Sequence, residues 1–123
     1  MYITELSMDE RIEKAFEVAN YMATLSNQRR LMLEEFNQKL IYYINGATFK
    51  ITPDLICLSK AWIDKGLVKD VVFIDSNDFP VLINDLNEFF NNITDQYVAA
   101  STEYSDKFVG LKVKRKISAI IEL

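Results

Sequence analysis

Apolar residues near the start of the chain recur at steps of three and four positions, which is the period of one face of a helix. Ser7 and Glu10 have the spacing of a capping box, in which each side chain accepts a hydrogen bond from the other residue's backbone N–H. We therefore expect a helix over residues 8–25. The apolar positions of its pattern are Met8, Ile12, Ala15, Phe16, Ala19 and Met22.

The polar run 26–30 interrupts this pattern. After it, the apolar residues between positions 31 and 40 fit neither the helical period nor the alternation of a strand. Residues 28–37 therefore have two interpretations, as a second helical piece or as the early part of a long first strand.

Two runs of β-prone residues flank Asn45 and Gly46. The pair Asn-Gly is typical of a two-residue type I′ turn, because both central positions of that turn need a positive φ and these residues tolerate it. Residues 39–51 are thus predicted to form a β-hairpin.

A helix is predicted directly after this hairpin, over residues 53–65. Thr52 can cap it through its hydroxyl, Pro53 suits its first position, and Gly66 is placed to end it in a left-handed conformation. Cys57, the one cysteine of the chain, is expected to be a small buried side chain in this helix. The expected inner face consists of Leu55, Leu58, Ser59 and Trp62.

Residues 71–74 and 79–83 are two further apolar runs around a polar turn, which indicates a second hairpin. Pro80 cannot donate a ladder hydrogen bond, so its strand is expected to begin there or to lie on an edge. The turn, residues 75–78, gathers carboxylate and amide oxygens that would suit a hard cation. Pro80 stands where an EF-hand loop needs glycine, however, and such residues are typical of β-turns. We expect a turn and no metal site.

The rest of the chain is predicted to form one long helix that begins after a second capping pattern, Asp85 with Glu88. Its apolar residues follow a near-heptad spacing with one four-residue insertion. They are Leu86, Phe90, Ile93, Tyr97, Ala100, Tyr104, Phe108 and Leu111.

These elements predict a single α+β domain over residues 1–123. It has an N-terminal helix, two β-hairpins forming a small, mainly antiparallel sheet with a short helix between them, and a long C-terminal helix. The length of 123 residues, half of them apolar, is sufficient for a hydrophobic core without disulfides or metals.

The net charge of −4 hides an asymmetry. Residues 107–123 hold five basic side chains and one acidic one, a net of +4, which leaves −8 for residues 1–106. An acidic body argues against a broad nucleic-acid surface, which depends on Lys and Arg. Only the basic tail could contact nucleic acid, through Lys112, Lys114, Arg115 and Lys116.

The chain has no histidine and only three glycines. It therefore lacks the base of Ser-His and Cys-His mechanisms, every histidine-containing zinc site, and a glycine-rich phosphate loop. Adjacent carboxylates such as Glu34 and Glu35 do not share a helix face, so they do not suit acid–base catalysis as a pair. We expect no enzyme activity, no catalytic residue and no cofactor.

The first residues lack the basic start and apolar core of a secretory signal. No apolar run approaches the length of a membrane span. We therefore expect an intracellular protein that is neither secreted nor bound to a membrane.

The run 34–46, read together with residues 49–56, resembles small proteins encoded by T-even-like tailed phages, particularly marine ones. Residues 71–81 and the long helix after them are similar to the same group, so the resemblance spans about residues 28–115. That group has no settled biochemical role. The resemblance therefore implies a phage context, in the host cytoplasm or the virion, and supplies no active-site residues.

The length of the C-terminal helix indicates self-association. From Leu86 to Leu111 its apolar residues span about 39 Å, whereas a domain of this size has a radius of gyration of about 14 Å. One end is therefore expected to extend beyond the core, exposed, and to pair with the same helix of a second copy. The alternative is that this helix folds back on the N-terminal helix of its own chain. The expected interface residues are Tyr104, Phe108, Leu111, Ile117 and Ile121.

These observations favour a non-enzymatic phage protein that acts through protein–protein contacts, as a virion assembly factor or a minor structural component. A homodimer is the favoured form, and other phage proteins are possible partners. The alternative is an accessory nucleic-acid-binding protein of phage replication that uses the basic tail.

Overall fold

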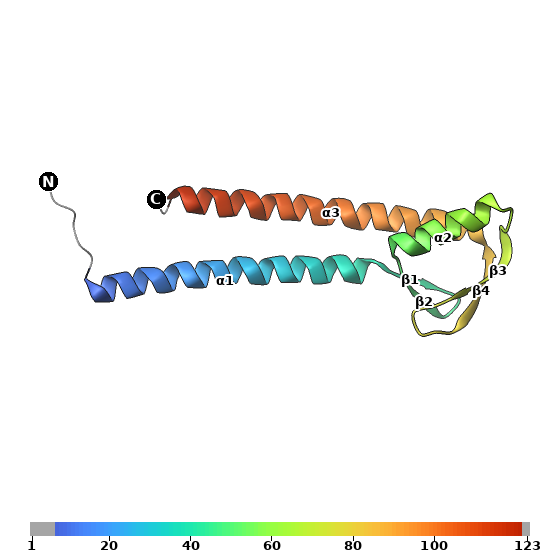
Figure 1. Ribbon diagram of the computed structural model, residues 1–123, viewed down its shortest axis with the longest axis horizontal. Helices are drawn as coiled ribbons and strands as arrows, with labels where there is room; N and C mark the ends of the chain where they lie inside the picture. The colour runs from blue at the N-terminus through green and yellow to red at the C-terminus, as the bar shows by residue number, and fades with distance from the viewer. Residues whose placement is uncertain (1–6, 122–123) are drawn as a thin grey trace.

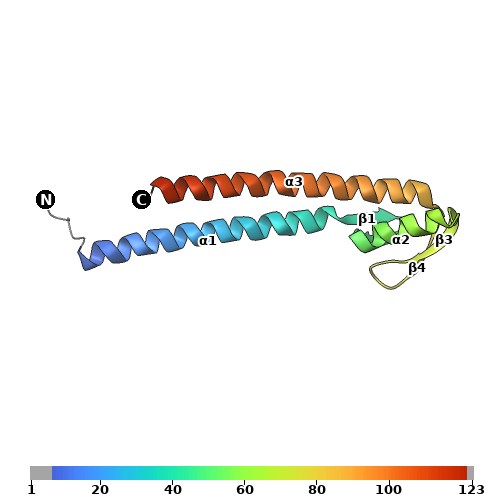
Figure 2. The same ribbon diagram turned by 45° about the horizontal axis from the view of Figure 1, so that its top comes forward.

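The structure, a computed structural model, describes residues 7–112 with their side chains and the helical backbone of residues 113–121. Two long helices, α1 (Met8–Lys39) and α3 (Leu86–Ile121), run side by side in opposite directions and form an arm (Figure 1, Figure 2). The segment between them folds into a small head at one end of the arm. The head contains β1 (Ile41–Ile44), β2 (Ala47–Lys50), α2 (Pro53–Asp64), β3 (Lys69–Ile74) and β4 (Pro80–Asp85). This order confirms the predicted α+β fold class.

α1 begins as predicted but ends later. The Ser7 hydroxyl accepts a hydrogen bond from the Glu10 N–H (3.1 Å), and the Glu10 carboxylate accepts one from the Ser7 N–H (3.2 Å), so the capping box is present. Residues 28–37 are helical, and the expected end at Leu25 is wrong because the helix continues to Lys39. The polar run before residue 31 contains no glycine or proline, so it interrupts the apolar pattern without breaking the helix.

The first hairpin has the predicted turn. β1 and β2 pair antiparallel with Ile44 opposite Ala47, which leaves Asn45 and Gly46 as a two-residue connection. Both residues have a positive φ, 50° and 76°, as a type I′ turn requires.

α2 begins at the predicted residue and ends at Asp64, one residue before the predicted end. The Thr52 hydroxyl accepts a hydrogen bond from the Leu55 N–H at 3.1 Å, and Pro53 opens the helix. At the other end Gly66 has a φ of 84° and donates its N–H to the Ile63 carbonyl at 2.9 Å.

The inner face of α2 differs from the prediction at two positions. Ser59 is buried, and Leu55 and Trp62 are half-buried, as expected. Leu58 and Cys57 are exposed, so the expectation that they face the core is wrong. A helix of 12 residues on the surface of the head buries only one narrow face, and the helical rotation places positions 57 and 58 outside it.

β3 and β4 form the second predicted hairpin, and β4 begins at Pro80. Asp75 closes the turn, because its carboxylate accepts hydrogen bonds from the backbone N–H groups of Asn77 and Phe79, both at 2.9 Å. These donors, that of Phe79 foremost, hold the pKa of Asp75 below its ordinary value, although burial acts in the opposite direction. The polar cluster of this segment thus forms a turn, as predicted.

In the described part of the chain the hairpins pair only within themselves, so the head has two two-stranded sheets and not one continuous sheet. Ser76 joins them. Its N–H donates to the Thr48 carbonyl at 2.9 Å, and its hydroxyl accepts from the Lys50 N–H at 2.9 Å. The second turn is therefore fastened to β2.

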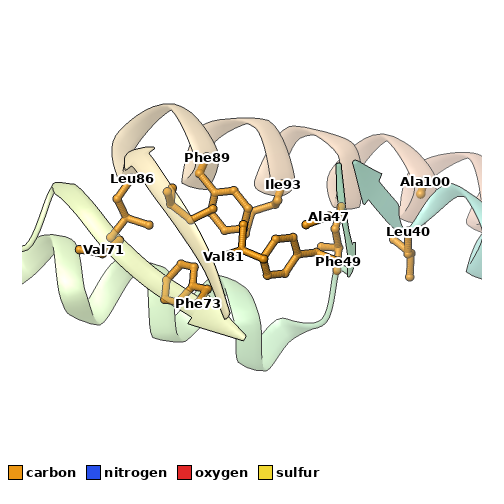
Figure 3. Close-up of a cluster of buried hydrophobic side chains, with 12 residues drawn as sticks. Leu40, Ala47, Phe49, Val71, Phe73, Val81, Leu86, Phe89, Ile93 and Ala100 are labelled. Atoms are coloured by element: carbon orange, nitrogen blue, oxygen red, sulfur yellow. The ribbon is translucent and has the colours of Figure 1, made fainter. Parts of the chain in front are cut away.

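The core of the head is an aromatic cluster around Phe89, which lies in the first turn of α3 (Figure 3). Its ring centroid is 5.3 Å from that of Phe49 in β2 and 5.5 Å from that of Phe73 in β3. Tyr42 in β1 adds a third contact at 5.6 Å, and Trp62 of α2 packs on Phe73 at 4.7 Å. One turn of α3 thus contacts both hairpins.

Gly46→Val is expected to destabilise the head. Nothing lies within 4 Å of the Cβ that a side chain would add there, so the effect comes from a β-branched residue at positive φ, about 1 to 3 kcal/mol. Thermal unfolding followed by circular dichroism should show a lower midpoint. Tyr43→Val, at an exposed strand position, is the matched control and should change the midpoint little. Equal midpoints for the Gly46 variant and the unmodified chain would show that the positive φ of this turn does not limit the stability of the head.

Candidate functional site

The arm is held together by an apolar seam between α1 and α3. Leu25 of α1 and Leu111 of α3 are each only 6 % exposed. The Phe36 ring lies 6.3 Å from that of Tyr97 and 5.1 Å from that of Tyr104, centroid to centroid. The C-terminal helix therefore folds back on the N-terminal helix of its own chain, which is the alternative that the sequence left open.

The predicted interface residues with described side chains lie in or beside this seam. Tyr104 and Phe108 are half-buried, with their rings stacked 6.2 Å apart, and Leu111 is buried. The expectation that Phe108 and Leu111 are exposed in a single chain is therefore wrong. α1 covers this side of α3 because it continues for 32 residues. The side chains of Ile117 and Ile121 lie outside the described residues.

Four charged side chains link the two helices beside the seam. They form a ring in which Glu35 and Lys39 of α1 alternate with Glu103 and Lys107 of α3, and each lysine contacts both carboxylates. The Lys107 ammonium lies 2.7 Å from Glu35 and 3.1 Å from Glu103. The Lys39 ammonium lies 3.2 Å from Glu35 and also binds Glu103.

This charge ring shifts the pKa of all four members. Hydrogen bonds from Lys107 and then Lys39 lower the pKa of Glu35, and bonds from Lys39 and then Lys107 lower the pKa of Glu103. In return, Glu103 contributes most to the raised pKa of Lys39, and Glu35 contributes most to that of Lys107. The ring therefore remains charged across a wide pH range.

Gln96 fixes the point at which the arm joins the head. Its side-chain amide donates hydrogen bonds to the carbonyl oxygens of Lys39 (2.6 Å) and Ile41 (2.9 Å). The last carbonyls of a helix have no partner within the helix, so this amide satisfies one at the end of α1. α3 thus holds α1 where the chain turns into β1.

The predicted nucleic-acid contacts lie near the far end of α3. Lys112 is exposed, and its ammonium is 6.0 Å from the centroid of the Phe108 ring. Lys107, at the start of the basic tail, belongs to the charge ring. The three remaining residues, whose side chains lie outside the described part, are Lys114, Arg115 and Lys116.

The N-terminal half of α1 carries an apolar surface that the arm leaves exposed. Met8 is 71 % exposed, Ile12 59 %, Phe16 66 % and Met22 47 %. Three exposed alanines lie between or beside them. We name this set the arm face; it consists of Met8, Ile12, Ala15, Phe16, Ala19, Met22 and Ala23.

The arm face is not the face of α1 that meets α3. The seam residues Leu25, Met32 and Phe36 lie about a third of a turn away from it around the helix axis. α1 therefore has two apolar faces, one packed on α3 and one exposed. The periodic pattern identified the helix, but the residues that define this pattern are exposed.

A second exposed apolar set lies on the head. We name it the hairpin face; it consists of Val72, Ile74, Phe79 and Leu82. Val72 and Leu82 are cross-strand partners in β3 and β4. The hairpin face and the arm face lie toward opposite ends of the molecule (Figure 1).

The described residues contain no cluster of side chains suited to holding a metal ion. Among them, no three Asp, Glu or Cys side chains gather where they could hold a metal ion. A hollow of about 440 Å³ between α1 and α3 is lined by apolar side chains, among them Leu31, Met32 and Leu111, and by the charged Glu35 and Lys107. No helix of the described part combines the length and the hydropathy needed to cross a membrane.

Comparison with models of protein families, with curated proteins and with solved structures found no match to this chain. No relative's activity, partner or site residue can therefore be transferred to it.

The charge ring predicts a stability that falls at both pH extremes. Folding lowers the pKa of Glu35 and Glu103, so their contribution is present above the ordinary value of 4.5 and is lost as the pH falls through the lowered values. Folding raises the pKa of Lys39 and Lys107. The contribution of these lysines to stability is therefore present below 10.5 and is lost as the pH rises through the raised values. Glu103→Gln should therefore lower the melting temperature at neutral pH and flatten its decline in acid.

Glu34→Gln is the matched control for this experiment. Glu34 pairs with Arg30 at 2.9 Å within α1 alone, and both side chains are exposed, an arrangement that contributes little to stability. Its melting profile against pH should follow that of the unmodified chain. Identical profiles for the Glu34 and Glu103 variants would show that the charge ring does not stabilise the arm.

Nucleic-acid binding through the basic tail is expected to be weak. Lys107 is already engaged by two carboxylates, and the remainder of the chain is acidic. Fluorescence anisotropy with a labelled DNA duplex should detect binding only at low salt and none at about 0.15 M ionic strength. Sub-micromolar affinity at that salt would favour the accessory nucleic-acid-binding function.

Proposed function

We propose that this protein is a non-enzymatic phage protein that acts through protein–protein contacts, as a virion assembly factor or a minor structural component. The observation that carries this proposal is the arm face, where Met8, Ile12 and Phe16 are each more than half exposed. The largest exposed apolar patch of a folded protein, typically a few hundred Å², is often a functional surface. The contact it offers is with another protein, acting in the host cytoplasm or the virion.

The shape of the arm face supports a protein partner. It is a ridge along a helix, which fits the groove or helix face of another protein and does not enclose a small molecule. By helical rotation, Asp9 and Glu13 flank it on one side, and Arg11 and Lys14 on the other. Flanks of mixed charge suit a protein better than nucleic acid or an anionic membrane, both of which favour basic flanks.

The overall shape supports a connecting role in an assembly. α1 contains 32 residues, so it spans about 48 Å and carries the arm face away from the head. The hairpin face lies at the other end of the molecule (Figure 1). A rod with an apolar surface toward each end is well suited to join other components. The resemblance of the sequence to small proteins of T-even-like phages supports the phage setting.

Photo-crosslinking tests the proposal in the phage's host. Benzoylphenylalanine in place of Phe16 should give covalent adducts with protein, because this ring is the centre of the arm face. The same substitution at Leu31 is the matched control, since Leu31 is similarly exposed but lies nearer the head, beyond the end of the arm face at Ala23. It should give few adducts.

Adducts that are equally abundant at both positions would contradict a specific contact at the arm face. Adducts with nucleic acid in place of protein would favour the alternative function. Recovery of the Phe16 adduct from purified virions would select the structural role over a transient role in assembly.

A further inference from the structure

The arm face is built from two parallel rows of side chains that differ in size. The large row, spaced by four residues, consists of Met8, Ile12 and Phe16. The small row, also spaced by four, consists of Ala15, Ala19 and Ala23. Rows with this spacing form the ridges and grooves by which helices pack on one another. The large row occupies the N-terminal part of the face, and the small row occupies the C-terminal part.

We propose that a second copy of this chain covers the arm face, with the two α1 helices antiparallel. This inference rests on the proposed function and names the partner of the same surface. A two-fold axis between positions 15 and 16 brings Met8 to the level of Ala23 and Ile12 to the level of Ala19 of the other copy. The two Phe16 side chains then meet beside the axis, on one edge of the interface.

The order of sizes selects the antiparallel arrangement. A parallel pair in register would place Ile12 opposite Ile12 and Ala19 opposite Ala19, so the helices would be forced apart at one level and would leave a void at the other. Large side chains opposite small ones keep the distance between the helices constant, as close packing requires. The arm face is therefore complementary to itself, which is the property of a two-fold interface.

Charge and shape agree with this arrangement. The axis places charged residues at the edges of the face at the same level as uncharged ones: Asp9 with Met22, Arg11 with Asn20, and Glu13 with Val18. No two of these like charges meet. The heads lie at opposite ends of the assembly, whereas a parallel pair would bring two heads, each wider than the arm, side by side (Figure 1).

The area of the arm face suits a reversible dimer. Its four large residues are 47 to 71 % exposed and leave a few hundred Å² of apolar surface on each chain. The alanines and the aliphatic parts of flanking side chains enlarge this area toward the ~800 Å² per partner of a standard interface. The dimer is therefore expected to form and dissociate with chain concentration.

Sedimentation equilibrium of the intact purified chain tests the pairing. Ile12→Ala opens a hole opposite Ala19, and Ala19→Ile forces two isoleucines together, so each change should weaken dimerisation about tenfold or more. The double variant exchanges the two residues and should restore an affinity within about threefold of the original. Restoration requires positions 12 and 19 to face each other across the two-fold axis.

Two control variants test whether the dimer forms through the arm face and through no other surface. Leu31→Ala changes an exposed residue of α1 nearer the head, outside the arm face, and Leu82→Asp changes the hairpin face; both should leave the dimer intact. Circular dichroism verifies that every variant keeps its helix content. A chain that is monomeric at all concentrations, a dimer that Ala19→Ile strengthens, or one that only Leu82→Asp disrupts would overturn the inference.

The failure of this inference is distinguishable from the failure of the proposed function. If Phe16 adducts in the host contain a different protein while the purified chain stays monomeric, self-association is wrong and the proposed function stands. If Phe16 gives no protein adduct and the chain is monomeric, both are wrong. An adduct with twice the mass of the chain, together with the rescue by the double variant, supports both.

Discussion

Phe89 connects the head to the arm, because its ring belongs to the core of the head and its backbone belongs to α3. It is 1 % exposed and contacts aromatic rings from both hairpins. Two-stranded sheets are at best marginally stable alone, so each hairpin depends on the cover that α3 and α2 provide. The same packing fixes the direction in which α3 leaves the head. The position of the whole arm therefore follows from one buried turn of helix.

The two helices of the arm make most of their specific contacts next to the head. Gln96 binds the carbonyl where α1 ends, and the charge ring and the contacts of Phe36 follow within the next turns. Leu25 is the last residue of α1, counting away from the head, that is buried. Between Leu25 and Met8 the apolar side chains of α1 are exposed or half-buried and do not belong to a core. The head and the adjacent part of the arm therefore stabilise each other. The N-terminal part of α1, in contrast, leaves its apolar arm face exposed.

Turns and caps could be predicted from the sequence because their chemistry acts within a few residues. Asn45 and Gly46 determine their turn by their tolerance of positive φ, and Ser7 and Thr52 cap helices that start immediately after them. The burial of Leu111 could not be predicted in this way, because it depends on α1, which is remote in sequence. The arm face was visible as a helical period, yet a period does not reveal which face of a helix is covered. The exposure of Cys57 escaped prediction for the same reason.

The residues of the arm face are unusual for the solvent-exposed side of a helix. Ile12 and Phe16 are poorer helix formers than Lys, Glu or Gln, which normally occupy exposed helical positions. Such residues are present on the other sides of the same segment, for example Glu10 and Glu17. On the arm face the local preference of the sequence therefore disagrees with its exposed setting, and conflicts of this kind are expected at functional surfaces. Since an isolated helical segment of this length is marginal in water, whatever covers the arm face also stabilises the end of α1. A partner bound to the arm face would therefore increase the helical order at the end of the arm.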